Sequence, residues 1–187
     1  IRLSLVGSEM CIRDRIDSGT VAIANIDTRK LTRILRTHGA QNGAIVGLAK
    51  GQAVTQALID QAIAAAKGAP KMAGLDLAQK VTVAKTYEWT QTEWQLGKGY
   101  GTQSAPKFHV VAYDFGVKKN ILRMLAERGC KVTVVPAKTP AADVLKFKPD
   151  GIFLSNGPGD PEPCDYAIKA AAELIETGIP TFGICLG

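Results

Sequence analysis

The sequence predicts an α/β protein with a parallel sheet, and two observations carry that prediction. From residue 107 onward, strand-like runs alternate with segments of helical period. The strand-like runs are apolar almost throughout, which is typical of parallel strands buried on both faces. The chain has 187 residues, enough for a sizeable core, and no apolar run approaches the ~18 residues needed to cross a bilayer.

The elements of this second half follow one another in alternation. Strands are expected at residues 108–113, 131–135, 151–155 and 179–184, and helices at residues 120–128, 141–147 and 165–176. Gly129 follows the first helix, where a glycine commonly ends a helix. Because ligands of open parallel sheets bind at the carboxyl ends of the strands, the residues that follow the last two strands should share one edge.

The preceding segment, residues 16–96, is expected to form a smaller mixed α/β domain. Asp27 and Thr28 offer an N-cap to a helix that Gly39 ends. The other elements expected here are strands at 21–26 and 44–48, a helix at 54–67 and a loose antiparallel pair within 87–94.

Two stretches are expected to lie outside these domains. Residues 97–106 combine glycines and polar residues with a closing proline, which is linker composition, so we place the domain boundary there. Residues 1–15 have no period that continues into the next segment, and they do not resemble a signal peptide. We interpret them as a non-native leader.

Charge and cysteine content narrow the possible functions. The net charge is +6, but only 6% of residues are aromatic and none lies within a basic run, so a nucleic-acid partner is not expected. The basic runs fit a solvated helix face or an acidic protein partner. The cysteines form no CxxC pair, so neither a metal site nor a disulfide framework is expected, and the cytoplasm is the expected location. They are Cys11, Cys130, Cys164 and Cys185.

Two strand ends carry residues suited to catalysis. The sequence GICLG at residues 183–187 puts Cys185 between two glycines, as in a nucleophile elbow. The sequence SNGPGDP at residues 155–161 predicts a rigid loop in which Gly159 lets its N–H approach a ligand. Alone, each pattern also fits a buried cysteine or an ordinary turn. Together, they suggest a thiolate that attacks a carbonyl carbon while the N–H groups of Leu186 and Gly159 hold the oxyanion.

These two motifs resemble those of the class I glutamine amidotransferases. Two further stretches are similar to the small subunits of glutamine-dependent carbamoyl phosphate synthetases within that superfamily. The first is IDTRKLTR at residues 26–33 with GAQNG at 39–43, and the second is VAYDFG at 111–116 with KNI at 119–121. The resemblance covers about residues 16–187.

The resemblance implies both a fold and a reaction. The fold is an incomplete amidotransferase domain at residues 107–187, preceded by an incomplete small-subunit N-terminal domain. Cys185 is implied as the nucleophile that releases ammonia from L-glutamine through a glutamyl thioester. Gly157, Gly159 and Leu186 are implied to contact glutamine or the oxyanion. The implied partner is a large synthetase subunit, which holds ATP and magnesium, so no cofactor, metal, nucleic acid or membrane is expected on this chain.

The family pattern is incomplete at both ends. The start of the family's N-terminal domain, with a serine that contacts glutamine, has no counterpart before the resemblance begins. The family's histidine base and its orienting glutamate lie downstream of the cysteine, beyond residue 187, and we expect His38 and His109 to be structural. We therefore expect a chain truncated at both ends and inactive alone. Two alternatives stay open: the amidotransferase component of another synthase, such as one that makes anthranilate, and a non-catalytic subunit-docking module.

Overall fold

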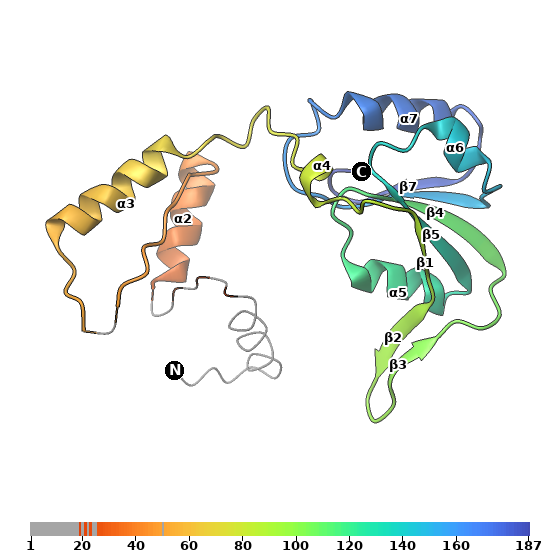
Figure 1. The fold of residues 1–187 in the computed structure, drawn as a ribbon, viewed down its shortest axis with the longest axis horizontal. Coiled ribbons are helices and arrows are strands. Elements are labelled where there is room, and N and C mark those ends of the chain that lie inside the picture. The colour runs from red at the N-terminus through yellow and green to blue at the C-terminus, as the bar shows by residue number, and fades with distance from the viewer. Residues whose placement is uncertain (1–18, 20, 22, 24–25, 50) are drawn as a thin grey trace. The chain divides into compact units, whose positions relative to one another are not determined.

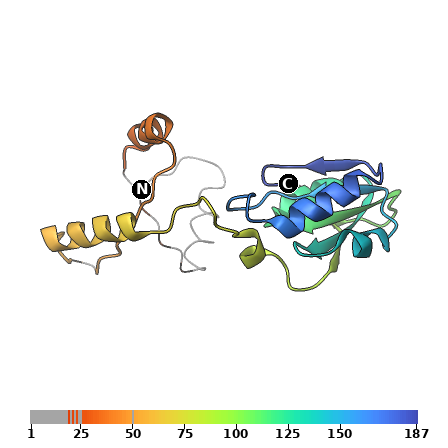
Figure 2. The ribbon, with the colours of Figure 1, turned by 90° about the horizontal axis from the view of Figure 1, so that it is seen from above.

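The structure is a computed structural model that describes residues 19, 21, 23, 26–49 and 51–187. These residues belong to two compact units, Ile1–Lys71 and Met72–Gly187, which Figures 1 and 2 show in two views. The leader predicted at residues 1–15 lies outside the described residues, as does half of the strand predicted at 21–26.

The first helix of the first unit is α2 (Thr28–His38), which begins and ends where its sequence predicts. The carboxylate of Asp27 accepts a hydrogen bond from the backbone N–H of Lys30 at 2.8 Å, which satisfies one of the free amides of the first turn. Gly39 follows the helix with a φ of +76°, a conformation that glycine adopts without strain.

The second helix of this unit, α3 (Gln56–Gly68), is also confirmed, and Thr55 caps its first turn through the N–H of Leu58. Residues 44–48 form no strand, although their apolar run predicted one. An apolar run becomes a strand only where a neighbouring strand can pair with it, and the described residues of this unit offer none.

The second unit is built on a five-stranded sheet with the strand order β1-β5-β4-β6-β7. Strands β4, β5, β6 and β7 are parallel, as predicted, and β1 pairs with β5 in the antiparallel direction. Their bounds are Tyr87–Trp89 for β1, Phe108–Asp114 for β4, Cys130–Pro136 for β5, Gly151–Leu154 for β6 and Thr181–Gly183 for β7.

Helices cover both faces of this sheet, with α5 on one side and α6 and α7 on the other (Figure 1). Alternate residues of β4 point to opposite faces: Val111 and Tyr113 pack in the cluster with α6 and α7, and Ala112 packs with α5. The bounds are Lys119–Glu127 for α5, Ala141–Leu145 for α6 and Asp165–Ile175 for α7. No described helix is both long and apolar enough to span a membrane.

Strands β2 (Gln91–Gln95) and β3 (Gly99–Thr102) form a two-stranded hairpin, which changes the strand pairing that the sequence predicted. The antiparallel pair expected within residues 87–94 does not form, because β1 pairs with β5 and β2 pairs with β3. The segment 97–106, expected to be a linker, contains β3. Gly97 and Gly99 have positive φ values of 79° and 76°, so its glycines form a tight turn whose composition resembles that of a linker.

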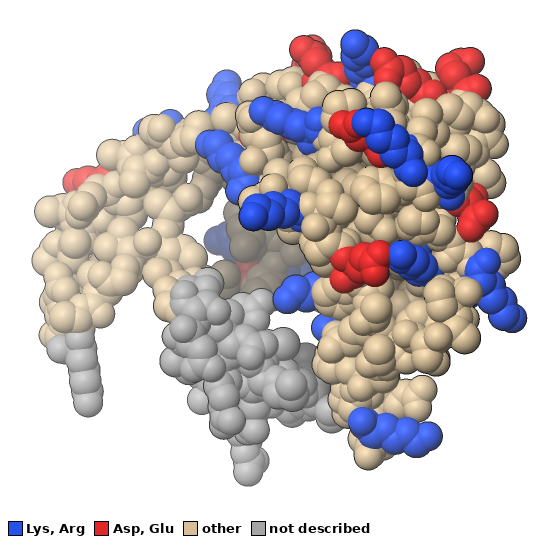
Figure 3. Space-filling model, turned by 45° about the vertical axis from the view of Figure 1, so that its right-hand side comes forward, with Lys and Arg blue, Asp and Glu red and all other residues tan. Residues whose placement is uncertain are grey.

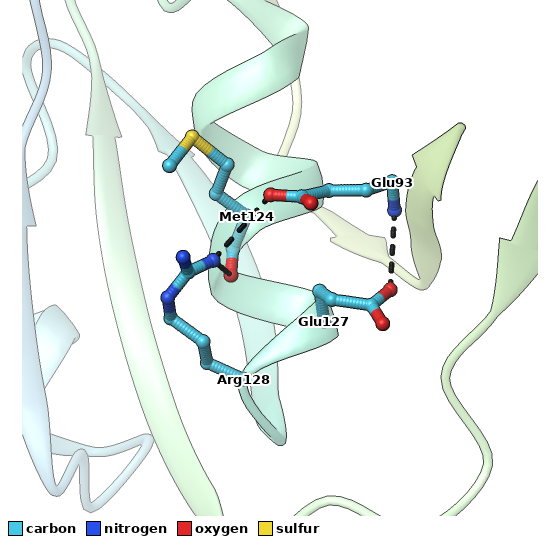
Figure 4. A network of polar contacts seen from close by, with 4 residues as sticks. All are labelled: Glu93, Met124, Glu127 and Arg128. Carbon is cyan, nitrogen blue, oxygen red and sulfur yellow. Dashed lines mark hydrogen bonds and ion pairs between the residues drawn. The ribbon is translucent and has the colours of Figure 1, made fainter. Parts of the chain in front are cut away.

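The hairpin is fastened to α5 by charged side chains (Figure 4). The backbone N–H of Glu93 donates to the carboxylate of Glu127 at 3.3 Å, and the guanidinium of Arg128 lies 3.4 Å from the carboxylate of Glu93. Arg128 also donates to the carbonyl of Met124 at 2.9 Å. The hairpin therefore belongs to the second unit, whose first residue is Met72.

The visible surface of the second unit carries both signs of charge. Figure 3 shows Lys and Arg side chains interspersed with Asp and Glu over this face. Such a mixture differs from the continuous basic stripe that is typical of nucleic-acid binding.

Candidate active site

Cys185 lies at the turn that follows β7, at the carboxyl edge of the parallel sheet. Its φ is +61°, a left-handed conformation that few non-glycine residues adopt. The N–H of Ile184 donates to the carbonyl of Leu154 at 3.1 Å, and the N–H of Gly187 donates to the carbonyl of Ile184 at 3.2 Å. These bonds hold the turn, and the thiol at its tip is exposed to solvent. These features match the strand end and the strained turn of a nucleophile elbow.

The two flanking glycines are required by the closeness of the turn. A Cβ on Gly183 would lie 2.5 Å from the carbonyl carbon of Gly187. A Cβ on Gly187 would collide with the carbonyl group of Leu154 and lie 2.7 Å from its Cβ. The GxCxG spacing thus has a steric cause, because the chain folds back onto itself and onto β6.

The glycine-rich loop after β6 lies beside this elbow. A Cβ on Gly157 would collide with the carbonyl oxygen of Phe115 and lie 2.8 Å from Cδ2 of Leu186. Gly157 is thus close to Leu186, the residue that follows Cys185. Gly159 is placed differently: with a φ of +98°, it lies against the backbone of residues 75–77. The structure brings Gly157, Cys185 and Leu186 together, and it places Gly159 at the outer part of the loop.

An open groove runs between the elbow, the glycine-rich loop and the start of α5. Cys185 lies in it, and the other residues that line it are Lys118, Ile121, Asn156, Gly157, Pro158 and Ile184. Lys118 and Asn156 are the polar residues of this lining, and Ile121 and Ile184 are among its apolar residues. Such a groove suits a small substrate that has both a polar and an aliphatic portion.

Sequence reasoning missed Lys118 and Asn156 as groove residues. Asn156 joins two loops, because its Nδ2 donates to the carbonyl of Gly116 at 3.0 Å and its Oδ1 accepts from the N–H of Lys118 at 3.2 Å. The topology of the sheet could have indicated both residues. Because β4 and β6 are parallel neighbours, the turns that follow them meet at one edge of the sheet.

Two buried side chains support these turns. The hydroxyl of Ser155 accepts from the N–H of Phe115 and donates to the carbonyl of Asn156, each at 2.9 Å. The carboxylate of Asp114 accepts from the N–H groups of Gly116 and Val117 at 2.9 and 2.8 Å. Buried polar groups that are fully paired fix local geometry, so the groove is built on a rigid base.

The other cysteines of the second unit are less suited to catalysis. Burial raises the pKa of Cys130 and also that of Cys164, and burial disfavours the thiolate that a nucleophile needs. Cys164 is buried, with its thiol directed at the carbonyl of Asp160 at 3.5 Å. The exposed Cys185 is therefore the best-placed nucleophile of this unit.

No histidine or carboxylate is among the described residues that line the groove. His109 stands near the start of β4, at the edge opposite the elbow, where its Nε2 lies 2.8 Å from the hydroxyl of Thr133 and its ring meets Phe147 edge-on at 6.4 Å. His38 is the last residue of α2 in the first unit. No described group of three or more His, Cys, Asp or Glu side chains could hold a metal ion.

Comparison with known proteins places this chain in a family. The family "Glutamine amidotransferase class-I" matches residues 111–187. The chain is 72% identical over 169 residues to "Carbamoyl phosphate synthase small chain" of Rubrivivax gelatinosus, which covers 90% of this chain and 44% of that protein.

Two further relatives carry the same name. The protein of Ralstonia nicotianae is 65% identical over 167 residues, covering 89% of this chain and 42% of that protein. The protein of Neisseria meningitidis serogroup B is 61% identical over 168 residues, covering 90% of this chain and 43% of that protein. The chain thus spans less than half the length of these curated relatives. It belongs to the carbamoyl phosphate synthase small-chain family, with a class I glutamine amidotransferase domain over residues 111–187.

Proposed function

We propose that this chain carries the nucleophilic part of a glutaminase site that supplies ammonia for carbamoyl phosphate synthesis, a step of arginine and pyrimidine formation. The observation that carries the proposal is the exposed, left-handed Cys185 beside the glycine-rich loop in one groove. The identity with carbamoyl phosphate synthase small chains supports it.

The proposed reaction begins with attack of the Cys185 thiolate on the side-chain amide carbon of L-glutamine. The new C–S bond forms as the carbonyl π electrons move to oxygen. The C–N bond then breaks, the nitrogen takes up a proton and leaves as ammonia, and water hydrolyses the glutamyl thioester to glutamate. The N–H of Leu186 supports the oxyanion as the residue after the nucleophile does in other elbows. Gly157 lies beside Leu186. By the family pattern, Gly157 and Gly159 would contact glutamine or the oxyanion.

The thiol also needs a base, and we propose that residues outside this sequence supply it. His109 is held by Thr133 at the opposite edge of the sheet, so it does not serve Cys185. By the family pattern, a histidine and a glutamate that follow residue 187 would act as base and orienting group. Residues 1–187 alone should then hydrolyse no measurable glutamine.

The partner in this proposal is the large synthetase chain that the name "small chain" implies. Ammonia released at Cys185 would react there with bicarbonate and ATP, and the large chain would bind the ATP with magnesium, in the cytoplasm. The lining of the groove supports glutamine as its ligand, because it combines polar residues, Lys118 and Asn156, with aliphatic ones such as Ile121 and Ile184.

The test uses the full-length chain assembled with its large chain. Cys185→Ser should lower glutamine-dependent carbamoyl phosphate formation by roughly 10³-fold or more, because a neutral hydroxyl is a much weaker nucleophile than a thiolate. Synthesis from added ammonia should continue. Cys130→Ala serves as the control, since Cys130 lies at the far end of β5, and it should retain activity.

Isotope-labelled glutamine should leave an acid-stable adduct on the wild-type chain but not on Cys185→Ser. Unchanged glutamine hydrolysis in Cys185→Ser would overturn the proposal. Assembly with the large chain in the absence of any glutamine hydrolysis by the wild type would instead favour the docking-module alternative.

A further inference from the structure

A strap formed by residues 72–83, which includes the short helix α4 (Ala78–Val81), lies across the outer side of the glycine-rich loop. The strap begins where the first compact unit ends, and it belongs to the second unit. Ala78 anchors it, because this residue is fully buried in the cluster with α6 and α7. None of the family motifs singled out in the sequence lies in this segment.

Asp160, the last residue of the glycine-rich loop before Pro161, joins the loop to the strap. Its Oδ2 accepts a hydrogen bond from the N–H of Gly74 at 2.8 Å, and its own N–H donates to the carbonyl of Leu75 at 3.0 Å. Its Oδ1 accepts from the N–H of Glu162 at 3.0 Å. The two backbone hydrogen bonds from Gly74 and Glu162 hold the pKa of Asp160 below its ordinary value, so the carboxylate stays ionised near neutral pH.

The same strap limits the position of the loop by steric contact. A Cβ on Gly159 would lie 2.6 Å from the carbonyl oxygen of Leu75 and 2.9 Å from the nitrogen of Leu77. A Cβ on Gly116 would lie 3.0 Å from Cδ of Pro158 and 3.1 Å from Cγ2 of Val81. The loop is therefore closely packed between the strap and the turn after β4, and it can move outward only if the strap moves as well.

The far end of the strap is fixed to the turn that supports the groove. The N–H of Val83 donates to Oδ2 of Asp114 at 2.8 Å, while Oδ1 of the same carboxylate binds the turn at Gly116 and Val117. The hydroxyl of Thr82 accepts from the N–H of Ala137 at 2.9 Å. Both ends of the strap thus form hydrogen bonds with loops at the carboxyl edge of the sheet, where Cys185 lies.

We propose that Asp160 is a positioning residue for glutamine hydrolysis, because it fastens to the strap the glycine-rich loop whose Gly157 lies against Leu186, next to Cys185. The inference rests on the proposed function. It predicts that the loop loses its set position, and the substrate loses its alignment with the thiol, when the carboxylate is removed.

The two acceptor oxygens make Asp160 difficult to replace. An asparagine can accept from one of the two amides through its Oδ1, but its NH₂ group cannot accept from the other. An alanine accepts from neither and leaves both amides without this partner. The expected loss is therefore graded, larger in Asp160→Ala than in Asp160→Asn. Losing a whole oxyanion-hole donor lowers kcat by about 10²–10³-fold, which sets the upper bound.

The test uses the full-length chain with its large chain and compares Asp160→Ala, Asp160→Asn and the control Glu162→Gln. Glu162 contributes only its backbone N–H to the described contacts, so the control removes a neighbouring negative charge and leaves the network intact. We expect kcat for glutamine hydrolysis to fall by about 10–100-fold in Asp160→Ala and by about 3–10-fold in Asp160→Asn. KM should change by less than about threefold, and Glu162→Gln should match the wild type.

A second readout separates positioning from a general loss of structure. Alkylation of Cys185 by iodoacetamide needs only an exposed thiol, whereas labelling by a chloroketone analogue of glutamine also needs the loop. Asp160→Ala should retain the first rate within about twofold and lose at least tenfold in the second. If Asp160→Ala does not fold, the same two labelling rates are compared for Asp160→Asn.

Three outcomes would overturn the inference. The first is a kcat within twofold of the wild type in the Asp160 variants. The second is an equal loss with both labelling reagents, which would indicate a purely structural role. The third is a wild type that hydrolyses no glutamine, and this result alone would also remove the proposed function.

Discussion

Cys185 combines an exposed thiol with a backbone conformation that costs the protein stability. Its φ of +61° lies in the region where a Cβ approaches the following carbonyl, at a cost of about 1–2 kcal/mol for a non-glycine residue. The hydrogen bonds of Ile184 and Gly187 hold the turn despite that cost. Strain retained at one exposed cysteine, in a groove, is typical of a functional position.

The strain predicts an unusual order of stability for two variants of Cys185. Cys185→Gly should unfold with a free energy about 1 kcal/mol higher than Cys185→Ala, because relief of the left-handed strain exceeds the extra chain entropy of glycine. Chemical denaturation of the full-length chain measures the difference. The control exchange Ala171→Gly, inside α7, should have the opposite sign, at about 1 kcal/mol. Equal stability of the two Cys185 variants would contradict the strain.

At the scale of elements, the predictable part of the fold is the part in which local pattern and tertiary context agree. Strands β4, β5 and β6 and helix α5 appear where apolar runs and helical spacing predicted them, and Gly129 ends α5 with a φ of +84°. The strand expected at 44–48 is absent, and the pairing of residues 87–95 is different. Strand pairing depends on partners distant in sequence, and a single sequence does not reveal them.

The candidate site likewise has one part that the sequence predicts and one part that depends on contacts between distant residues. Cys185, Gly157 and Leu186 lie in short motifs, so the sequence alone predicts their proximity, and their catalytic roles stay predictions. The contacts of Asp160 with Gly74 span 86 residues, and no local pattern indicates them. The sequence alone therefore does not predict the contact between the strap and the loop, although Asp160 itself lies in the glycine-rich motif.

A cation on α5 contacts the hairpin of β2 and β3 and also an aromatic ring of β1. The guanidinium of Arg123, on α5, lies 4.2 Å from the ring centroid of Tyr100 and 5.7 Å from that of Trp89. Its Nε donates to the side chain of Gln91 at 2.8 Å. A planar guanidinium can stack and donate at the same time, which an ammonium group cannot.

Arg123→Lys should therefore lower the free energy of unfolding by about 1 kcal/mol even though it keeps the charge. Tryptophan emission should shift to longer wavelength as the hairpin loosens, because both tryptophans, Trp89 and Trp94, lie in β1 and β2. Lys119→Gln, on the exposed side of the same helix, is the control and should stay within about 0.5 kcal/mol of the wild type. A spectrum unchanged in Arg123→Lys would show that the stacking does not hold the hairpin.

At the scale of the whole molecule, the two compact units differ in how much they bury. The described helices of the first unit contain no buried residue, and on α2 Leu31, Ile34 and Leu35 are 45%, 40% and 39% exposed. The second unit has two buried clusters, one on each face of its sheet. A core of this kind resists local unfolding, whereas exposed helices open easily. The protein should therefore show one resistant part and one sensitive part.

Limited digestion with trypsin locates where the resistant part begins. Lys71 is exposed at the end of the first unit, while Lys80 lies in α4, which buried Ala78 anchors. Lys98 lies in the tight turn of the hairpin, where its N–H donates to the carbonyl of Gln95 at 3.1 Å. Because a protease needs an unfolded segment around its cleavage site, we expect a stable fragment that starts at Met72, identified by mass spectrometry. A fragment starting at Gly99 would instead favour the boundary that composition places at 97–106. A start at Val81 would show that the strap is not held on the sheet unit, and it would remove the structural basis for the role of Asp160.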